Sequence, residues 1–429
     1  MFNNKYIYSF TLLILLPFLL IYIIFISIKK DDFNFIKNRM GILNKINNTD
    51  NICIHCASLG EVNGAKELIK EIIKNNNVLI STNTNSGKIR ACELFPDLDV
   101  VYFPLDYKFI VSNWLKSLKI KSMIVYETEI WPNFYKICGY ENIKLCIVNA
   151  RIQKNLHKKK FVKKIYAEAL ENCQFILCKS NYEKKKYLKL GINEKNIFSI
   201  GNLKYAYKPQ VIKEEDQKRK STEFSNTKNF FLMASTHDPD EKNFLQAIQE
   251  LLINEISVVI APRHIERSKK IANMFRDIGI SVHFLSNASK NYVLGEWSIN
   301  AVLIIDTFGD LSKFYSNARY VYVGGGYSRR GVQNIIEPSI YGKPILVGPN
   351  IDNFYEEIMS LKEQDGITVI EDVASISTKE SIVKHIREFR NLNDETLIKR
   401  GDVAKEHSLK FKNIVEKYVE FLKQKKVIS

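Results

Sequence analysis

Short runs of apolar, largely β-branched residues alternate with longer segments of helical periodicity, and this pattern limits the fold more than any other feature of the sequence. The runs are NICIHCAS, NVLIST, DVVYFP, KSMIVYE and KLCIVNA in the first half, and NFFLMAS, ISVVIAPR, AVLIID, RYVYVGGG and KPILVG in the second. Continuous apolar runs of this length are typical of parallel strands that helices cover on both faces. We therefore predict two α/β domains, each built on an open, doubly wound parallel sheet.

A charged segment at residues 208–226, almost free of large apolar side chains, separates the two predicted domains. We expect it to be a linker between a Rossmann-like domain at 31–207 and a second one at 227–405. The last residues, 406–429, are expected to form a helix that packs back on the N-terminal domain. A chain of 429 residues has the length of two or three domains, in agreement with this division.

An uncharged apolar segment at residues 6–28 precedes the first domain. As a helix rising about 1.5 Å per residue, it would cover the roughly 30 Å hydrocarbon core of a bilayer. Five cations follow it before residue 46, whereas Lys5 alone precedes it, so the positive-inside rule places the rest of the chain in the cytoplasm. We expect residues 1–30 to be an uncleaved anchor, and a helix lying in the membrane interface, which Pro17 leaves open, is the alternative.

Composition and charge exclude some classes of protein and favour others. Hydrophobic residues make up 45% of the chain and charged residues 26%, a globular balance that excludes wholesale disorder and collagen-like repeats. The net charge of +16 should attract a polyanion, whether nucleic acid, an anionic membrane surface or a phosphorylated substrate. The seven cysteines fall mostly inside apolar runs and indicate buried thiols in a reducing compartment. Cys53 and Cys56 lack the second matched pair of a metal site.

Acidic residues follow two of the predicted strands of the first domain. They therefore come at the carboxyl ends of these strands, which is where open parallel sheets bind their ligands. Glu61 comes where a strand passes into a helix, so it is a candidate general base, or else a carboxylate that complements the helix dipole. Glu127 and Glu129 end an apolar strand, and residues two apart on a strand share a face. Both carboxylates could therefore point into a site with one pKa raised, or one could cap the following helix.

In the second domain, Gly324, Gly325 and Gly326 follow the strand RYVYV and form a candidate phosphate loop, because glycine lets the backbone approach a ligand closely. Asn334 and Glu337 are three residues apart on one helix face, and the carboxylate could accept both hydroxyls of a ribose. Neither the G-x-G-x-x-G fingerprint with its acidic residue nor the G-x-x-x-x-G-K-[ST] loop occurs, which argues against dinucleotide and ATPase sites.

An ordered series of motifs contains these residues. They are SLGE at 58–61, the segment 82–87, FPLD at 103–106, ETEIWPN at 127–133, NARI at 149–152, GNLK at 201–204, ASTHDPDE at 234–241, PRHIER at 262–267, DTFGDL at 306–311 and the block 324–350. The set resembles the Kdo transferases of lipopolysaccharide synthesis, which transfer 3-deoxy-D-manno-octulosonic acid (Kdo) from its CMP-activated form to a lipid A precursor. The resemblance runs through nearly the whole chain, anchor included.

The resemblance implies a GT-B glycosyltransferase, with two Rossmann-like domains facing a cleft, the acceptor on the N-terminal domain and CMP on the C-terminal one. It implies an inverting, metal-independent transfer that uses no cofactor, with Glu61 as general base and with Glu127 and Lys204 as transition-state stabilisers. The implied CMP contacts are Pro262, Arg263, Phe308, Gly309, Asp310, Asn334, Ile335, Ile336 and Glu337. The chain departs from the family at Gln333, where histidine is common, and at Asp310, where glutamate is common, so we expect altered donor affinity.

The implied partners are a CMP-Kdo donor, a lipid A precursor and an anionic membrane surface, with no nucleic acid, and the implied location is the cytoplasmic face of the inner membrane. Cations and helix N-termini can replace a metal in neutralising the phosphate of such a donor. Two alternatives stay open. One is a UDP-sugar-dependent GT-B transferase or sugar-nucleotide epimerase, and the other is a non-catalytic, membrane-bound polyanion-binding protein, in which Glu61 would have no role.

Overall fold

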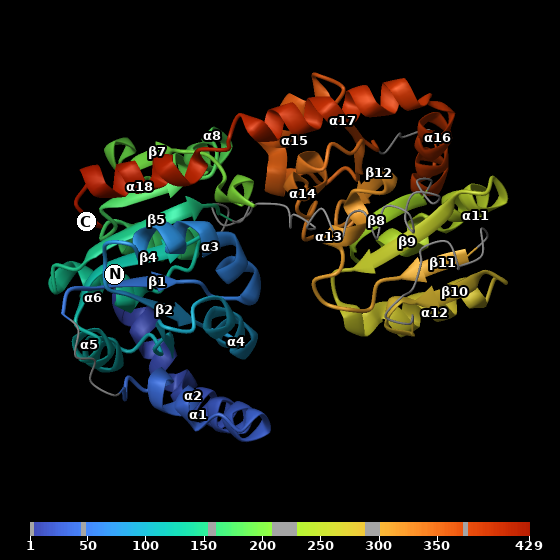
Figure 1. Ribbon diagram of the computed structural model, residues 1–429. Coiled ribbons are helices and arrows are strands. Elements are labelled where there is room, and N and C mark those ends of the chain that lie inside the picture. The colour runs from blue at the N-terminus through green and yellow to red at the C-terminus, as the bar shows by residue number, and fades with distance from the viewer. Residues whose placement is uncertain (1–3, 44–48, 153–159, 208–229, 288–300, 372–375) are drawn as a thin grey trace. The chain divides into compact units, whose positions relative to one another are not determined.

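The computed structural model describes residues 4–43, 49–152, 160–207, 230–287, 301–371 and 376–429 (Figure 1). The chain divides into two compact units, the first comprising Met1–Ala206 with Lys412–Ser429 and the second Tyr207–Phe411. Each unit contains one parallel sheet of seven strands with helices packed around it. This arrangement confirms the predicted class of two doubly wound α/β units. The expected linker at 208–226 lies outside the described residues.

The sheet of the first unit has the strand order β3-β2-β1-β4-β5-β6-β7. Its strands are β1 (Asn51–His55), β2 (Val78–Thr82), β3 (Asp99–Tyr102), β4 (Ile120–Tyr126), β5 (Lys144–Ala150), β6 (Phe175–Cys178) and β7 (Ile197–Ser199). Its helices are α3 (Leu59–Ile72), α4 (Asn85–Leu94), α5 (Lys108–Ser117), α6 (Pro132–Tyr140), α7 (Lys160–Leu170), α8 (Asn181–Lys189), α18 (Ile414–Gln424) and the 3₁₀ turns η2 (Glu194–Asn196) and η3 (Leu203–Ala206). The strand order reverses between β1 and β4, and doubly wound sheets bind ligands at the carboxyl ends of such strands.

The second sheet has the order β10-β11-β9-β8-β12-β13-β14, and it reverses between β8 and β12. Its strands are β8 (Phe230–Thr236), β9 (Ser257–Pro262), β10 (Ser281–Phe284), β11 (Ala301–Ile304), β12 (Ala318–Val323), β13 (Ile345–Val347) and β14 (Ile367–Val369). Its helices are α10 (Asp240–Asn243), α11 (Leu245–Ile253), α12 (Ser268–Arg276), α13 (Ser312–Tyr315), α14 (Ile336–Ile340), α15 (Tyr355–Lys362), α16 (Thr378–Asn391) and α17 (Asp394–Leu409), with 3₁₀ turns η4 (Ile265–Arg267), η5 (Leu285–Asn287) and η6 (Asp352–Phe354).

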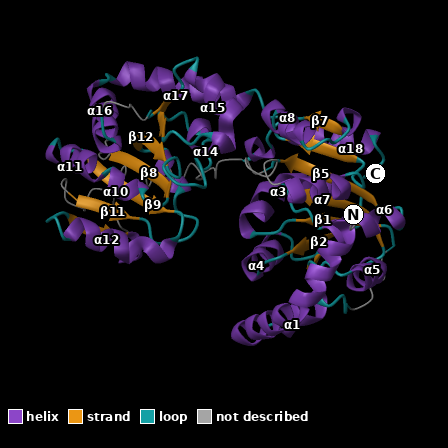
Figure 2. Cartoon of the chain, turned by 180° about the vertical axis from the view of Figure 1, so that it is seen from behind, coloured by secondary structure: helices purple, strands orange, loops and turns teal. Residues whose placement is uncertain are grey.

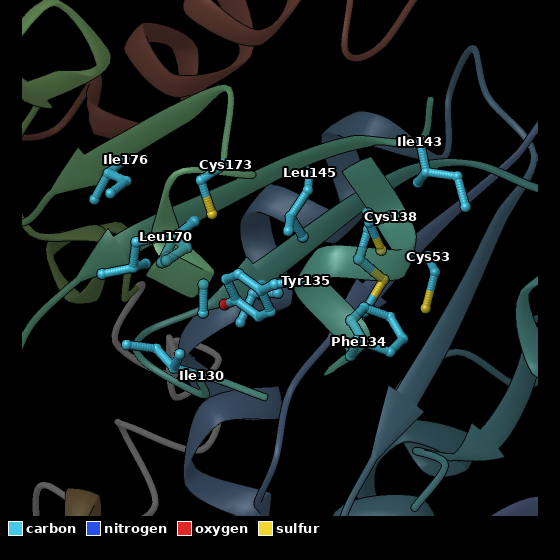
Figure 3. Close-up of a cluster of buried hydrophobic side chains, with 14 of the residues drawn as sticks. Cys53, Ile130, Phe134, Tyr135, Cys138, Ile143, Leu145, Leu170, Cys173 and Ile176 are labelled. Carbon is cyan, nitrogen blue, oxygen red and sulfur yellow. The ribbon is translucent and has the colours of Figure 1, made fainter. Parts of the chain in front are cut away.

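The core of the first unit lies between the sheet and helices such as α6 and α7, and Figure 3 shows part of it. Phe134, Tyr135 and Cys138 of α6 are fully buried and belong to one cluster with Cys53 of β1 and Cys173. Six of the seven cysteines are buried and unpaired, and Cys92 is exposed. The thiols thus behave mostly as the small buried hydrophobes that the sequence predicted.

Helix α1 (Asn4–Lys30) contains the apolar N-terminal segment, and within the described residues Tyr8–Lys29 is long and apolar enough to cross a membrane. Only 11% of that stretch is buried. The helix also contacts the first unit, because the Tyr8 hydroxyl donates to Asp106 Oδ2 at 2.7 Å and Ile23 is buried against helix α2 (Phe33–Arg39). One face of α1 is therefore attached to the unit that carries the first candidate site.

Helix α18, at the C-terminal end of the chain, belongs to the first unit, and both views show it beside β5 and β7 (Figures 1 and 2). It packs against α3 and η3. The Phe421 ring lies 5.8 Å from that of Phe175 and 4.7 Å from that of Phe198, measured between centroids. The chain thus returns to its N-terminal unit after it has completed the second one.

Candidate active site

Glu61 lies at the carboxyl end of β1, in the first turn of α3. The turn that joins strand and helix positions its carboxylate, because the backbone N–H of Ala57 donates to Glu61 Oε2 at 2.6 Å. Burial raises the pKa of Glu61 to about 8, and the negative charges of Glu127 and Glu129 add to this rise, whereas the Ala57 hydrogen bond and Arg151 oppose it. Glu61 is thus a fixed carboxylate whose basicity suits proton transfer near neutral pH.

Glu127, at the carboxyl end of β4, is 5% exposed and forms ion pairs with Arg151 and Lys204. Its carboxylate lies 2.7 Å from Nε of Arg151 and 3.2 Å from Nζ of Lys204. Burial is the largest single effect and raises the pKa of Glu127, but the charges of Lys204, Arg151 and Lys179 outweigh it and lower the pKa to about 2. The structure therefore brings Glu127 and Lys204 together and keeps the carboxylate ionised.

Glu129 has a different environment, although it is only two residues from Glu127. Strand β4 ends at Tyr126 and Glu127 has a positive φ of 59°, so the alternation of a strand does not extend over the two glutamates. Glu129 Oε2 accepts hydrogen bonds from Asn83 Nδ2 at 3.2 Å and from Trp131 Nε1 at 3.0 Å, and burial raises its pKa. Of the two carboxylates, Glu129 is the one with the raised pKa.

Neither glutamate caps helix α6. The backbone N–H groups of Asn133 and Phe134 donate instead to Asp106, at 3.0 and 2.7 Å. Asp106 comes from the FPLD motif and is buried, and burial raises its pKa to about 6 although these hydrogen bonds lower it. The helix-capping alternative for Glu127 and Glu129 is therefore wrong, because a distant residue satisfies the helix N-terminus.

Three basic residues at this site were not among the predicted ones. Arg151 and Lys179 directly follow β5 and β6, so their position after a strand was an available signal. Arg39 comes from α2, and its guanidinium donates to Asn83 Oδ1 at 3.2 Å and to the Asn83 carbonyl at 3.0 Å. Burial lowers the pKa of Arg39 to about 10, so it remains a cation at neutral pH. Nothing in its local sequence marks Arg39 as part of the site.

The second candidate site lies at the carboxyl ends of β8 and β12. Asp240 is fully buried there and accepts hydrogen bonds from the backbone N–H groups of His237 and Gly325, at 2.8 and 2.7 Å, and from the Tyr322 hydroxyl at 2.9 Å. The N–H of Gly324 donates to the Ala234 carbonyl at 2.8 Å. Two of the three amides in the candidate phosphate loop are thus engaged within the unit.

The glycines of this loop are required by close packing of the backbone. A Cβ on Gly324 would lie 2.5 Å from Thr236 Cα, and one on Gly326 would lie 2.5 Å from Gly348 Cα. Only a residue without a side chain fits at these two positions. A function of the loop in phosphate binding stays a prediction.

Replacing Gly324 with alanine should therefore destabilise the second unit by about 1–3 kcal/mol through overpacking. Thermal unfolding of the variant checks this result. Gly279→Ala is the control, because its Cβ would meet no atom within 4 Å and only its positive φ of 79° strains the backbone. Equal effects of the two substitutions would contradict the steric argument.

The other predicted donor contacts lie on three loops of the second unit. Pro262 ends β9, and the backbone N–H of Arg263 donates to the Thr236 carbonyl at 3.0 Å. Phe308 is 86% exposed beside Gly309, whose φ is 85°. Asp310 accepts hydrogen bonds at 2.5 Å from both the Thr307 hydroxyl and Lys313 Nζ.

The segment 334–337 opens helix α14. Asn334 Oδ1 accepts the backbone N–H of Ile336 at 3.1 Å, and Asn334 Nδ2 donates to Glu337 Oε1 at 2.9 Å. The asparagine therefore fixes the turn that leads into the helix and holds the glutamate. Ile335 and Ile336 are fully buried, so only their backbone groups are placed to contact a ligand.

A basic cluster, missed in the sequence, lies beside Arg263. It comprises His237, His264 and Arg330. The centroids of the two histidine rings are 5.7 Å apart, and Nη1 of Arg330 lies 3.1 Å from Nε2 of His264. Burial lowers the pKa of His237 to about 4, so this imidazole is neutral at physiological pH. The signal in the sequence was again the position of these residues, since His237 and His264 follow β8 and β9.

Comparison with known proteins identifies the relatives of the chain. Residues 34–207 match the family model described as 3-deoxy-D-manno-octulosonic-acid transferase (kdotransferase). The 3-deoxy-D-manno-octulosonic acid transferase of Haemophilus influenzae is 25% identical, over 98% of this chain and 98% of its own length. That of Rickettsia prowazekii is 28% identical over 87% of this chain and 79% of its own length. A bifunctional glycosyltransferase/methyltransferase of Fusobacterium nucleatum is 28% identical over 85% of this chain, which spans 58% of that protein.

Solved structures with the same fold include a glycosyltransferase from Rickettsia africae, with a TM-score of 0.61 and 15% identity over 88% of this chain and 98% of its own. UDP-GlcNAc 2-epimerase from Neisseria meningitidis has a TM-score of 0.59 and 17% identity over 87% of this chain and 100% of its own. These similarities establish the GT-B-like fold alone. The family model and the relatives in sequence confirm the resemblance that the motifs indicated: this chain is similar to the 3-deoxy-D-manno-octulosonic acid transferases.

Proposed function

We propose that the protein is an inverting, metal-independent glycosyltransferase that moves Kdo from CMP-Kdo to a lipid A precursor. The observation that carries this proposal is the arrangement of Glu61, Glu127 and Lys204 at the switch point of the first sheet. The pKa of Glu61, about 8, suits proton acceptance in weak base, Glu127 stays ionised, and the sequence relatives of the chain include Kdo transferases.

In the proposed reaction an acceptor hydroxyl attacks the anomeric carbon of Kdo and gives its proton to Glu61. The bond from that carbon to the phosphate oxygen breaks at the same time, and CMP leaves with the bonding electrons. Glu127 stays ionised and keeps Lys204 and Arg151 in place, so the site presents a fixed charge pattern to the transition state.

The donor is proposed to bind the second unit. In this proposal the carboxylate of Glu337, which Asn334 holds, accepts hydrogen bonds from the ribose hydroxyls, and the exposed ring of Phe308 stacks on the cytosine base. Arg330 of the basic cluster and the neighbouring Arg263 offer cations for the phosphate and for the carboxylate of Kdo. The division into an acceptor-binding unit and a CMP-binding unit follows from this assignment.

Helix α1 and the net charge of +16 support a location at the cytoplasmic face of the inner membrane. A lipid A precursor is anionic and lies in the bilayer, so an anchored, basic enzyme would meet it there. This location and the identity of the acceptor are parts of the proposal.

The rate of transfer should rise with pH through about 8. Glu61 accepts a proton only when it is ionised, and its pKa is about 8, so a small fraction of the enzyme is active in weak acid and most of it in weak base. The measurement is kcat/KM for transfer between about pH 6 and pH 9, with the stability of the donor followed separately. A profile that falls over this range would contradict the role of Glu61 as base.

The function itself is tested with the full chain in detergent, a tetraacylated lipid A precursor and either CMP-Kdo or UDP-GlcNAc. We expect a product with the mass of the Kdo adduct from CMP-Kdo alone, and thermal protection by CMP but not by UDP. Turnover or epimerisation of UDP-GlcNAc without transfer from CMP-Kdo would overturn the proposal in favour of the UDP-sugar alternative.

A further inference from the structure

We propose that three buried polar residues, Tyr126, Asn149 and Tyr418, form a hub that positions the catalytic groups of the first unit, and that α18 at the end of the chain is therefore part of the support of the active site. This inference rests on the proposed roles of Glu61, Glu127, and Lys204. The members of the hub are positioning residues, because none of them is proposed to touch a substrate.

Asn149 is the centre of the hub. It is fully buried near the end of β5, and its side chain is bonded at both ends. Nδ2 donates to the Tyr126 hydroxyl at 3.0 Å, and Oδ1 accepts the backbone N–H of Leu203 at 3.0 Å. Tyr126 directly precedes Glu127, and Leu203 directly precedes Lys204. One amide thus holds the side chain of the residue before Glu127 and the backbone of the residue before Lys204, the two members of the 3.2 Å ion pair.

Tyr418 adds a second attachment, from the other end of the chain. It is fully buried, and its hydroxyl donates to the Gly201 carbonyl at 2.8 Å. The backbone of Asn149 also acts on this hydroxyl, because it opposes the rise in the pKa of Tyr418 that burial causes. Gly201 has a φ of 121°, which favours glycine, and it begins the GNLK turn that carries Lys204. The hydroxyl of Tyr418 therefore links α18 to the turn that Asn149 also holds through Leu203.

The hub also reaches the helix that carries Glu61. Gly64 lies three residues after Glu61 on α3, and a Cβ at this position would be 2.4 Å from the Tyr126 hydroxyl oxygen. Helix α3 is thus packed directly against the hub, and α18 contacts both α3 and η3. Elements carrying all three proposed catalytic residues meet at this cluster.

A loss of positioning should be visible in the rate before it is visible in folding. A single buried hydrogen bond contributes little to the stability of a whole unit. In contrast, displacing a catalytic group by about 1 Å can reduce a rate by about a hundredfold. Removing one hydroxyl from the hub therefore separates a positioning role from a merely structural one.

The test compares Tyr418→Phe with Tyr320→Phe in the full chain. Tyr320 is a suitable control because it is also fully buried, in β12 of the second unit, and its hydroxyl has no hydrogen-bond partner within the described part of the chain. For Tyr418→Phe we expect kcat for Kdo transfer to fall about tenfold or more, with KM for donor and acceptor within about twofold of wild type. Tyr320→Phe should leave kcat unchanged.

Hydrogen–deuterium exchange provides a readout that does not depend on activity. In Tyr418→Phe the backbone amides of the segment 201–204 should exchange faster than in wild type, whereas Tyr320→Phe should not change them. Unchanged exchange in Tyr418→Phe would overturn the hub, and faster exchange with an unchanged kcat would overturn its catalytic role. A wild-type protein that is inactive with CMP-Kdo would overturn the proposed function, while the exchange result would still decide whether the hub exists.

Discussion

Replacing Glu61 with glutamine is expected to reduce Kdo transfer by about 10²–10⁴-fold, the range that a general base contributes. Glutamine keeps the size of the side chain but cannot take the proton of the acceptor hydroxyl. Glu61 lies in the first unit, whereas the proposed CMP contacts lie in the second, so CMP should bind the variant as it binds wild type. The measurements are transfer from CMP-Kdo under single-turnover conditions and CMP titration by calorimetry.

The matched control is Glu67→Gln, on the same helix. Glu67 pairs with Lys70 at 3.0 Å on the surface of α3, so its replacement should leave transfer unchanged.

The pKa of Glu61 also determines the direction in which stability changes with pH. Since folding raises this pKa from 4.5 to about 8, the folded state favours the protonated form, and this contribution to stability is lost as pH rises from about 4.5 to about 8. Glu61→Gln should therefore be more stable than wild type in weak base, and an active variant would exclude Glu61 as the base.

Replacing Lys204 with methionine should reduce both activity and stability. The substitution removes a cation that lies 3.2 Å from the buried Glu127 carboxylate. Breaking a buried ion pair costs about 3–5 kcal/mol when the partner is left alone, and because Arg151 remains we expect about 2 kcal/mol here. Transfer should fall by about a hundredfold, since a fixed charge at the reacting centre is lost. Urea unfolding and steady-state kinetics measure the two effects.

Lys70→Met is the control for this substitution. It breaks the exposed pair with Glu67, and exposed pairs contribute about 0–1 kcal/mol. If Lys204→Met were as stable and as active as Lys70→Met, the ion pair with Glu127 would have neither a structural nor a catalytic role.

The periodicity of the sequence predicted most of both sheets. Each of the ten apolar runs contains a strand, and these are β1–β5, β8, β9 and β11–β13. The sequence reasoning missed β6, β7, β10 and β14, which have only three or four residues each. Three of these four, β7, β10 and β14, are edge strands. Length alone does not explain this, because β3, β11 and β13 are as short and were predicted. The missed segments become strands because a neighbouring strand offers its backbone.

The positions of Glu61 and Glu127 were determined by the sequence alone, because a residue that directly follows a strand of a parallel sheet must lie at its carboxyl edge. Their charge states were decided only by the tertiary structure. Burial beside other carboxylates raises the pKa of Glu61 to about 8, whereas Arg151 and Lys204 hold the pKa of Glu127 at about 2. The hydrogen bond of Tyr418 was also decided only by the tertiary structure, because its partner Gly201 lies 217 residues away in the chain. Charges and hydrogen bonds act through space, so no local pattern of residues encodes them.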